Sequence, residues 1–346
     1  MSDVPQLPDR TPNKQATSRT NGQANEQPTA AAERESRPAL PLPQQDGVLV
    51  LSKPGGMTSA SCIARVKRRF GQKKIGHAGT LDPMAQGVLL VLLGQATKIS
   101  GHLMDNGEKV YSGIIRLGLV TDTWDAEGRV LETRPVTGVD KDAVQAAMAA
   151  LTGTYEQRVP AYSAAKHEGR PLYELARKGL DAPVKSKTVT ISRGEAELVG
   201  PERIHFRVAC SSGTYIRSLA HSLGSRLGCG GMLEALTREY SHPFGIGEAH
   251  ALDAVLDDPE GFPERVAGIV AALPDWPKLR LGADDAARVR QGNRIAYDPA
   301  AMAMLPFAPG LRALLQDENG KALALAETAL SDGRGVWALV RGLWNS

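Results

Sequence analysis

Hydrophobic positions change their spacing several times along the chain, and each change predicts an element. The run GVLVLSKP from Gly47 is apolar on consecutive positions and predicts a buried strand. Ile63, Val66 and Phe70 then recur at helical spacing, after an N-cap at residues 58–59 and before a glycine at position 71. Residues 72–87 predict a loop. The run VLLVLLG at 88–94 predicts a buried segment of either type.

Strand and helix patterns alternate in the next part of the chain without a strict βαβ order. Residues 109–118 predict a strand and residues 140–151 an amphipathic helix. Two neighbouring strands are predicted at 188–199 and 203–211, and a helix from Ile216 that closes at Gly228. This mixture predicts an α+β fold, with a mixed, largely antiparallel sheet in the main domain and helices flanking it.

Changes of composition divide the chain into three parts. Residues 1–45 hold seven of the 22 prolines, six glutamines and no aromatic residue, so we expect a disordered tail there. Residues 46–272 form the predicted main domain. A Pro-Asp-Trp-Pro stretch at 274–277 indicates a linker, and the short strand patterns after it predict a small β-barrel over 273–346.

Composition excludes several classes of protein. The chain has 346 residues, 42% of them hydrophobic and 23% charged, which is typical of a globular protein of about two domains. Its longest aliphatic run, at 88–93, is far shorter than the roughly 18 residues of a membrane span. Without a secretory signal pattern, we expect a cytoplasmic protein with no membrane partner. Three cysteines exclude a disulfide framework, and zinc, ATP and dinucleotide motifs are absent from the sequence.

Charge is unevenly distributed, although the net charge is only +3. The 35 residues from Gly47 to Leu81 contain seven basic residues and no acidic one. A basic helix that leads into a basic loop suggests a phosphate-binding surface, whereas a solvated helix face would normally carry balancing carboxylates. The basic residues are Lys53, Arg65, Lys67, Arg68, Arg69, Lys73 and Lys74.

Asp82 is the first carboxylate after this basic stretch. With Pro83 it could form no more than a turn. The positive charge before it favours the ionised carboxylate, which can act as a nucleophile or a base. A phosphate-binding surface beside such a group suggests chemistry on the sugar or base of a nucleotide. A nucleophilic Cys210 or Cys229 is an alternative, although small buried cysteines are more common.

Five blocks of sequence, in order between about residues 46 and 250, resemble the TruB family of tRNA pseudouridine synthases. The resemblance implies isomerisation of the uridine at position 55 of the tRNA T-loop, without cofactor or metal. The last seventy or so residues resemble a PUA-type RNA-binding barrel. The five blocks are GVLVLSKPGGMTS (47–59), KKIGHAGTLDPMAQGVLLVLLGQATK (73–98), KVYSGIIRLGLVTDTWDAEG (109–128), VPAYSAAKHEGRPLYELAR (159–177) and SSGTYIRSLAHSLGSRLGCGGMLEALTR (211–238).

The resemblance also implies a role for individual residues. Asp82 matches the catalytic aspartate, which either attacks C1′ or abstracts the 2′ proton, and Arg217 matches the arginine that pairs with it. Tyr111 matches the tyrosine that stacks on the target base, and His77 a loop histidine that helps to extrude the nucleotide. Each of these residues also has a purely structural interpretation. Apolar pocket positions are matched by Tyr215 and Leu236, and RNA contacts are assigned to Lys53, Arg65, Arg68, Arg69, Lys73 and Lys74.

Three functions remain open at the level of sequence. The first is an enzyme that acts alone on tRNA, and the second is an RNA-binding or RNA-folding protein in which Asp82 is structural. The third is a pseudouridine synthase directed by a guide RNA. Because no long basic extension is present, we favour the enzyme that acts alone, with the tRNA T-arm as partner, no obligatory protein partner, and a monomer as the default.

Overall fold

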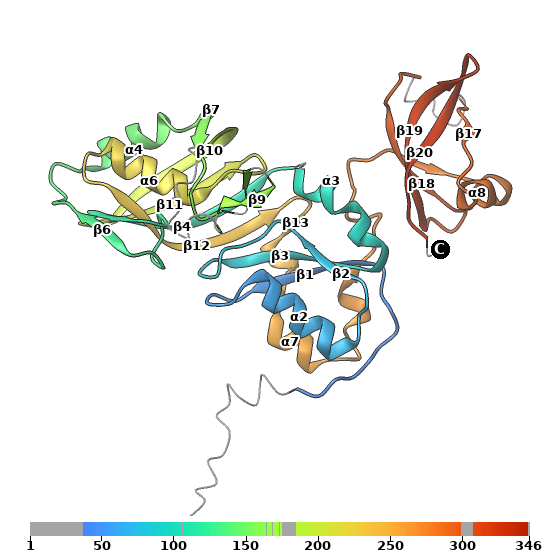
Figure 1. Cartoon of the computed structure of the whole chain (residues 1–346), viewed down its shortest axis with the longest axis horizontal. Helices are drawn as coiled ribbons and strands as arrows, with labels where there is room; N and C mark the ends of the chain where they lie inside the picture. Colours follow the sequence, from blue (N-terminus) through green and yellow to red (C-terminus); the bar gives the residue numbers. More distant parts are fainter. Residues whose placement is uncertain are drawn as a thin grey trace, which may run out of the picture. The chain divides into compact units, whose positions relative to one another are not determined.

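An 11-stranded mixed sheet forms the larger part of the fold (Figure 1). The computed structural model describes residues 37–105, 107–163, 165–167, 169–172, 174, 185–298 and 307–344. The strand order along the main path is β14-β1-β3-β12-β4-β11-β10-β7, with mostly antiparallel neighbours. The predicted α+β fold is therefore confirmed. Its strands are β1 (Gly47–Lys53), β2 (Ile75–Ala78), β3 (Gln86–Leu93), β4 (Lys109–Leu117), β7 (Gly153–Arg158), β10 (Ser186–Gly200), β11 (Arg203–Cys210), β12 (Gly231–Ser241), β13 (Phe244–Gly245), β14 (His250–Ala251) and β15 (Val266–Ala267).

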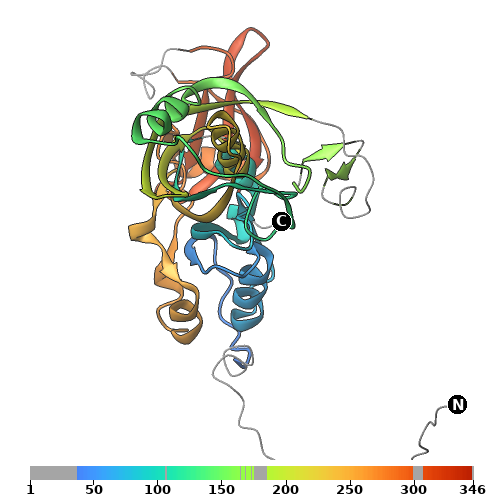
Figure 2. The same cartoon turned by 90° about the vertical axis from the view of Figure 1, so that its left-hand side faces the viewer.

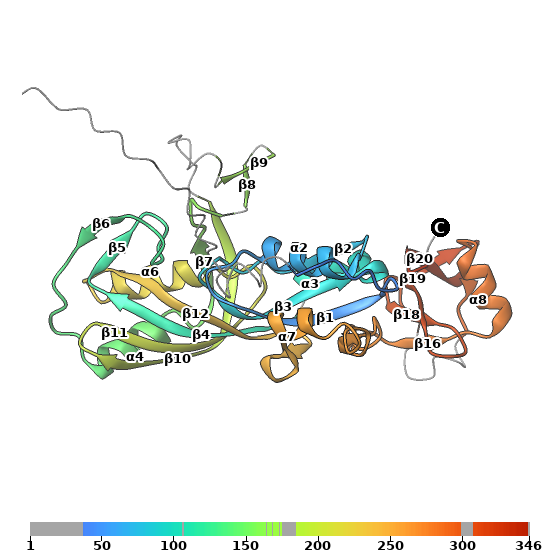
Figure 3. The same cartoon turned by 90° about the horizontal axis from the view of Figure 1, so that it is seen from below.

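β1 and β3 are buried on both faces, which explains why their sequences are apolar at consecutive positions. Odd-numbered residues such as Leu49 and Leu89 enter one hydrophobic core, and even-numbered residues such as Val48 and Leu90 enter another. Helices α2 and α7 lie side by side on the first of these faces (Figures 1 and 3). The segment at 88–94, whose type the sequence left open, is therefore a strand as far as Leu93.

The helices begin and end close to the predicted positions. Thr58 is the N-cap of α2, and Gly71 ends this helix in the left-handed conformation with φ 63°. Asp140 caps the predicted helix at 140–151. None of the helices in the described part of the chain is long and apolar enough to cross a membrane. The helices are α2 (Ser59–Phe70), η1 (Gly94–Ile99), α3 (Ser100–Asp105), α4 (Lys141–Ala149), α6 (Ile216–Arg226), η2 (Ile246–Glu248), α7 (Leu252–Asp257), η3 (Pro263–Arg265) and α8 (Ala283–Arg290).

Residues 72–87 contain a strand that the sequence did not predict. β2 pairs antiparallel with the second half of β3, from Ala78 opposite Leu90 to Ile75 opposite Leu93. Because β12 pairs with β3 only at its first two residues, the rest of that edge is open to β2. The prediction of a continuous loop is therefore wrong, and the turn that follows β2 is attached to the sheet at both of its ends.

The predicted tail, residues 1–45, lies outside the described residues as far as position 36. Residues 38–45 are described, and they bind to the C-terminal end of α2. The N–H groups of Leu40 and Leu42 donate to the carbonyls of Arg69 and Phe70, and the Gln72 side chain bonds to backbone groups of residues 43 and 45. Residues 38–45 therefore pack on the helix, because their N–H groups satisfy free carbonyl groups at the C-terminal end of α2.

A second, five-stranded sheet follows near the predicted boundary at 273. Its order is β16-β18-β19-β20-β17, so β16 and β17 are free edges and the described strands curl without closing a barrel. The last two long strands of this sheet form a hairpin, in which Ser331 lies opposite Arg334. The division of the chain at 273 stays a prediction. The strands are β16 (Lys278–Arg280), β17 (Ile295–Ala296), β18 (Arg312–Gln316), β19 (Ala322–Ser331) and β20 (Arg334–Gly342).

Two further pairs of strands stand outside both sheets. β5 (Leu119–Thr121) pairs with β6 (Val130–Thr133), and the loop between them reaches back to β12 through the bridge of Asp125 with Leu233. β8 (Lys166–His167) pairs with β9 (Arg170–Pro171), away from the large sheet (Figure 2). The β5–β6 loop is important for the site described next.

Candidate active site

Asp82 lies in the turn between β2 and β3, and this turn is fixed on both sides of the carboxylate. On one side, the buried Ser59 hydroxyl donates to the Leu81 carbonyl and accepts from the Leu81 N–H. On the other, the Pro83 carbonyl accepts from the Gly56 N–H at 2.9 Å and from the Lys53 ammonium at 3.0 Å. The first turn of α2 and the end of β1 thus determine where Asp82 stands.

Lys53 has this structural role and cannot contact RNA, because it is only 1% exposed. Its ammonium also donates to the carbonyls of Pro54 and Met57, and burial lowers its pKa. The prediction of an RNA contact at Lys53 is therefore wrong, and its hydrogen bonds to backbone carbonyls give it a supporting role instead.

Arg217 holds Asp82 from the opposite side. Its Nε lies 2.9 Å from Oδ2 of Asp82, and its Nη2 lies 3.3 Å from Oδ1, so the guanidinium grips both carboxylate oxygens. The Arg217 side chain is 7% exposed, against 36% for Asp82. The two residues that the resemblance paired are thus brought together, and Arg217 is not a solvated residue. The exposed part of Asp82 remains accessible to a ligand.

Asp125 is a second carboxylate on Arg217, which sequence reasoning missed. Its Oδ2 lies 3.6 Å from Nη1 of Arg217, while its Oδ1 accepts from the Thr123 hydroxyl at 2.6 Å and from the Glu127 N–H. Arg217 also donates to the carbonyls of Thr123 and Tyr162. In the sequence Asp125 looks like any aspartate of a polar turn, and only the fold shows that it is buried.

Arg238 is the other missed residue, and it clamps the ends of the Asp82 turn. Its Nε donates to the Val88 carbonyl at 2.7 Å and its Nη2 to the Gly79 carbonyl at 2.8 Å, with the side chain 1% exposed. Gly87 is required beside it, because φ is 96° there and a Cβ atom would lie 2.3 Å from the Arg238 carbonyl oxygen. A strand prediction at 231–241 would have placed Arg238 on the same face as Leu236.

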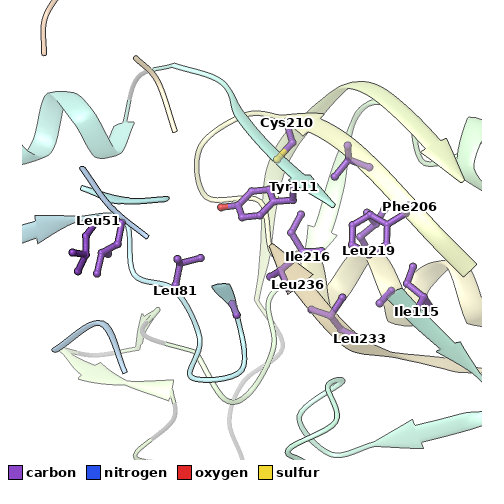
Figure 4. Close-up of a cluster of buried hydrophobic side chains, with 14 of the residues drawn as sticks. Leu51, Leu81, Tyr111, Ile115, Phe206, Cys210, Ile216, Leu219, Leu233 and Leu236 are labelled. Carbon is purple, nitrogen blue, oxygen red and sulfur yellow. The ribbon is translucent and has the colours of Figure 1, made fainter. Parts of the chain in front are cut away.

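Tyr111 and Leu236 form an apolar wall close to this turn. Both are buried and belong to one hydrophobic cluster with Leu81, the neighbour of Asp82. Figure 4 shows the Tyr111 phenol with its oxygen directed toward the side where Leu81 lies, away from Cys210. Burial raises the pKa of Tyr111, with the neighbouring Arg238 guanidinium acting in the opposite direction. The phenol is therefore neutral at neutral pH.

Tyr215 is half-buried at the N-cap of α6, two residues before Arg217. Its N–H donates to the Gln157 side chain at 2.8 Å, and its carbonyl accepts from the same side chain at 3.1 Å. This pair of hydrogen bonds fixes the start of the helix that carries Arg217.

His77 is half-buried on β2, and its Nε2 lies 3.1 Å from the Thr80 hydroxyl. Burial lowers its pKa, and the positive charge of Arg238 adds to the effect, so the imidazole is neutral at neutral pH. The fold thus places this predicted residue on the strand that leads into the Asp82 turn.

The basic residues of α2 do not form one continuous face. Arg69 donates to the Leu256 carbonyl of α7 and to the Pro38 carbonyl, which gives it a structural role. Lys67 and Arg68 are exposed in the last turn of α2, where cations are favoured by the helix dipole. Arg65 is half-buried, and Lys73 and Lys74 are exposed just before β2.

The cysteines do not have the properties of a nucleophile. Cys62, Cys210 and Cys229 are free and buried. Burial raises the pKa of each thiol, and that of Cys210 to about 11. A reactive cysteine needs a lowered pKa and access to a substrate, so the cysteine alternative has no support.

Comparison with known proteins identifies the family of the chain. The family model of the N-terminal domain of TruB family pseudouridylate synthases matches residues 67–216. The chain is 62% identical over 302 residues to a tRNA pseudouridine synthase B of Nitratidesulfovibrio vulgaris strain Miyazaki F, covering 87% of this chain and 98% of the relative. It is 61% identical over 305 residues to that of Oleidesulfovibrio alaskensis, covering 88% of this chain and 98% of the relative.

A solved structure shares the fold. An H/ACA RNP bound to a substrate RNA containing 2′-deoxyuridine contains a chain that matches with a TM-score of 0.65 and 22% identity, covering 86% of this chain and 85% of that one. Together, the fold and the relatives define an isomerase of the pseudouridine synthase class. Within this class, the chain belongs to the TruB family.

Proposed function

We propose that this enzyme acts on tRNA, that it converts the uridine at position 55 of the T-loop to pseudouridine, and that Asp82 is its catalytic residue. The observation that carries the proposal is the two-point contact of Arg217 with Asp82, in a turn held on both sides. The tRNA substrate is supported by relatives at 61–62% identity that are named tRNA pseudouridine synthase B.

The reaction rearranges one bond between uracil and ribose. The N1–C1′ bond breaks, the base turns, and a C5–C1′ bond forms, while C5 loses a proton and N1 gains one. Positive charge develops on the sugar as the first bond breaks, and an ionised carboxylate stabilises it as in glycosidases. Asp82 serves this step either by attacking C1′ or by abstracting the 2′ proton, and the two-point contact of Arg217 holds the carboxylate in a fixed orientation for both.

The apolar wall has its own role in the proposal. The detached uracil must be retained and water must be excluded until the new bond forms. Tyr111 and Leu236 are buried next to the Asp82 turn and offer a ring face and an aliphatic surface to the base. We assign Tyr215 to the same pocket. His77, at the beginning of the turn, is assigned to the extrusion of the nucleotide.

The surface around the turn supplies the RNA contacts of the proposal. Lys73 and Lys74 are exposed immediately before β2, and Arg65 and Arg68 lie on the helix that precedes them. Lys53 and Arg69 are left out of this set because backbone carbonyls occupy them. We assign residues 273–346 to a PUA-like RNA-binding domain, and we place the enzyme in the cytoplasm, where its substrate is made, as a monomer without an obligatory protein partner.

A tritium-release assay tests the function. Unmodified tRNA transcript labelled at C5 of uridine releases its label to water when pseudouridine forms. We expect about one equivalent per tRNA from the wild type and none from Asp82→Ala, which should still bind tRNA. Asp142→Ala, an exposed carboxylate on α4, serves as the control and should react like the wild type. Release from Asp82→Ala at the wild-type rate would reject the role of Asp82.

The same assay separates the alternative functions. Tritium release from bare tRNA by the purified chain, mapped to position 55, excludes a need for a guide RNA. Tight binding without release from the wild type would favour a protein that binds RNA without chemistry. Release only after addition of a second RNA would favour the guided class.

A further inference from the structure

Trp124 occupies an unusual position in the β5–β6 loop. Its φ is 63°, in the left-handed region that bulky side chains rarely adopt. Its two neighbours in the sequence are both partners of Arg217, Thr123 through its carbonyl and Asp125 through its carboxylate. The left-handed backbone conformation of Trp124 therefore lies between the two groups that contact Arg217, the Thr123 carbonyl and the Asp125 carboxylate.

The Trp124 ring is held by side chains from two other elements. It stacks on the His221 imidazole with ring centres 4.5 Å apart and an angle of 7° between the planes. The Arg158 guanidinium lies over the same ring, 5.4 Å from its centre. His221 is on α6, one turn after Arg217, and the Arg158 carbonyl accepts from Ser218 of that helix. The ring thus connects the loop to the helix that carries Arg217.

The backbone around Trp124 is attached to β12 but not to α6. The Trp124 carbonyl accepts from the Leu233 N–H at 2.9 Å, and the Ala126 N–H donates to the Leu233 carbonyl. Its own N–H donates within the loop, to the Thr121 carbonyl. The stack on His221 is therefore a direct side-chain contact between Trp124 and α6, in addition to the bonds that Arg217 makes with the neighbours of Trp124.

His221 is suited to a stacking contact. In the described residues its Nδ1 is buried without a hydrogen-bond partner. Burial lowers its pKa, and the positive charges of Arg158 and Arg134 add to the effect, so the stacked imidazole is neutral. The imidazole therefore offers its neutral ring face to the indole.

We infer that Trp124 is a positioning residue for the active site: its indole, stacked on His221 and covered by Arg158, holds Thr123 and Asp125 against Arg217 and so orients Asp82. The inference rests on the proposed function. It requires no contact between Trp124 and the RNA. The loss of the ring should therefore slow the chemical step and leave tRNA binding unchanged.

Kinetic measurements on three variants of Trp124 test this. Trp124→Ala should lower kcat by on the order of 10- to 100-fold, with KM and the tRNA Kd within about twofold of the wild type. Trp124→Phe keeps a stacking ring and should stay within about threefold in kcat. Trp124→Gly suits the left-handed backbone but lacks the ring, and should be as slow as Trp124→Ala. Trp276→Ala, a tryptophan outside the site, is the control.

A double variant tests the contact itself. If the stack on His221 carries the effect, Trp124→Ala with His221→Ala should be no slower than Trp124→Ala alone, since both changes break one contact. Wild-type kcat in Trp124→Ala, full activity in Trp124→Gly, or a loss confined to KM and Kd would each overturn the inference. A wild type without tritium release would instead reject the proposed function. Circular dichroism and melting of each variant establish that it is folded.

Discussion

Arg217 contacts Asp82 through two nitrogen atoms, although the two residues are 135 positions apart in the sequence. The arginine is the more buried of the two, and it also binds Asp125, so its own position does not depend on the substrate. The Asp82 carboxylate is therefore oriented before RNA arrives. Such preorganisation lowers the cost of reaching the transition state.

Replacing the guanidinium group of Arg217 by the ammonium group of a lysine should slow the reaction. Arg217→Lys keeps one positive charge but cannot contact both oxygens of Asp82 and the Asp125 carboxylate at once. We expect kcat to fall by about 100-fold or more in the tritium assay, with tRNA binding retained. Arg226→Lys, at the exposed end of the same helix, should behave like the wild type. Equal activity of the two variants would contradict the orienting role.

Removing the clamp of the Asp82 turn should cost stability. Arg238→Met leaves the carbonyls of Gly79 and Val88 without their charged donor in a buried place. We expect a loss of about 2–4 kcal/mol in the free energy of unfolding, measured with urea. Arg203→Met breaks an exposed ion pair with Glu234 and should leave the free energy of unfolding nearly unchanged. Equal losses in the free energy of unfolding for the two variants would show that the buried contacts of Arg238 stabilise the fold no more than an exposed ion pair does.

Neutralisation of the exposed basic residues should change the salt dependence of tRNA binding. Phosphate contacts release counterions, so each one adds roughly one unit to the slope of log K against log salt. Lys73→Gln with Lys74→Gln should weaken binding and lower this slope by about 1–2. Arg69→Gln should leave the slope unchanged and reduce stability, because Arg69 binds the carbonyls of Pro38 and Leu256. A lower slope for Arg69→Gln, with an unchanged slope for the double lysine variant, would show that Arg69 contacts the RNA.

Cys210 should resist alkylation. Burial raises its pKa to about 11, so only roughly 0.1% of it is thiolate at pH 8. Labelling by iodoacetamide, followed by mass spectrometry, should be slow in the folded protein and rise about tenfold with each pH unit up to 10. In guanidinium chloride all three cysteines should react. Rapid labelling of folded Cys210 at pH 8 would contradict the burial described above.

The sequence predicted best those elements whose signals are local. The helix at 59–70 has its N-cap, its apolar face and its terminal glycine within fourteen residues. In β11, polar and apolar residues alternate from Arg203 to Val208, and so do exposed and buried positions. β2 was missed because its four residues include a glycine and a histidine, and its formation depends on the open edge of β3. No local pattern reports such an edge.

The candidate site shows the same limit. Asp82 and Arg217 could be paired because motifs of a known family contain both, and the fold brings them together. Charge counting could not separate Lys53 and Arg69, which bind carbonyls, from Lys73 and Lys74, which face solvent. Asp125 and Arg238 were missed because burial, rather than residue type, makes them important. These distinctions follow from packing between distant segments.

The burial of β1 and β3 on both faces bears on how modular this enzyme can be. The face with Val48, Val50 and Leu92 shares its core with Leu314 and Leu325 of the small sheet. A chain truncated near residue 273 would expose these aliphatic side chains to water and is expected to aggregate. In evolution, gain or loss of the C-terminal region would therefore require accompanying polar substitutions on the very strands that support the Asp82 turn.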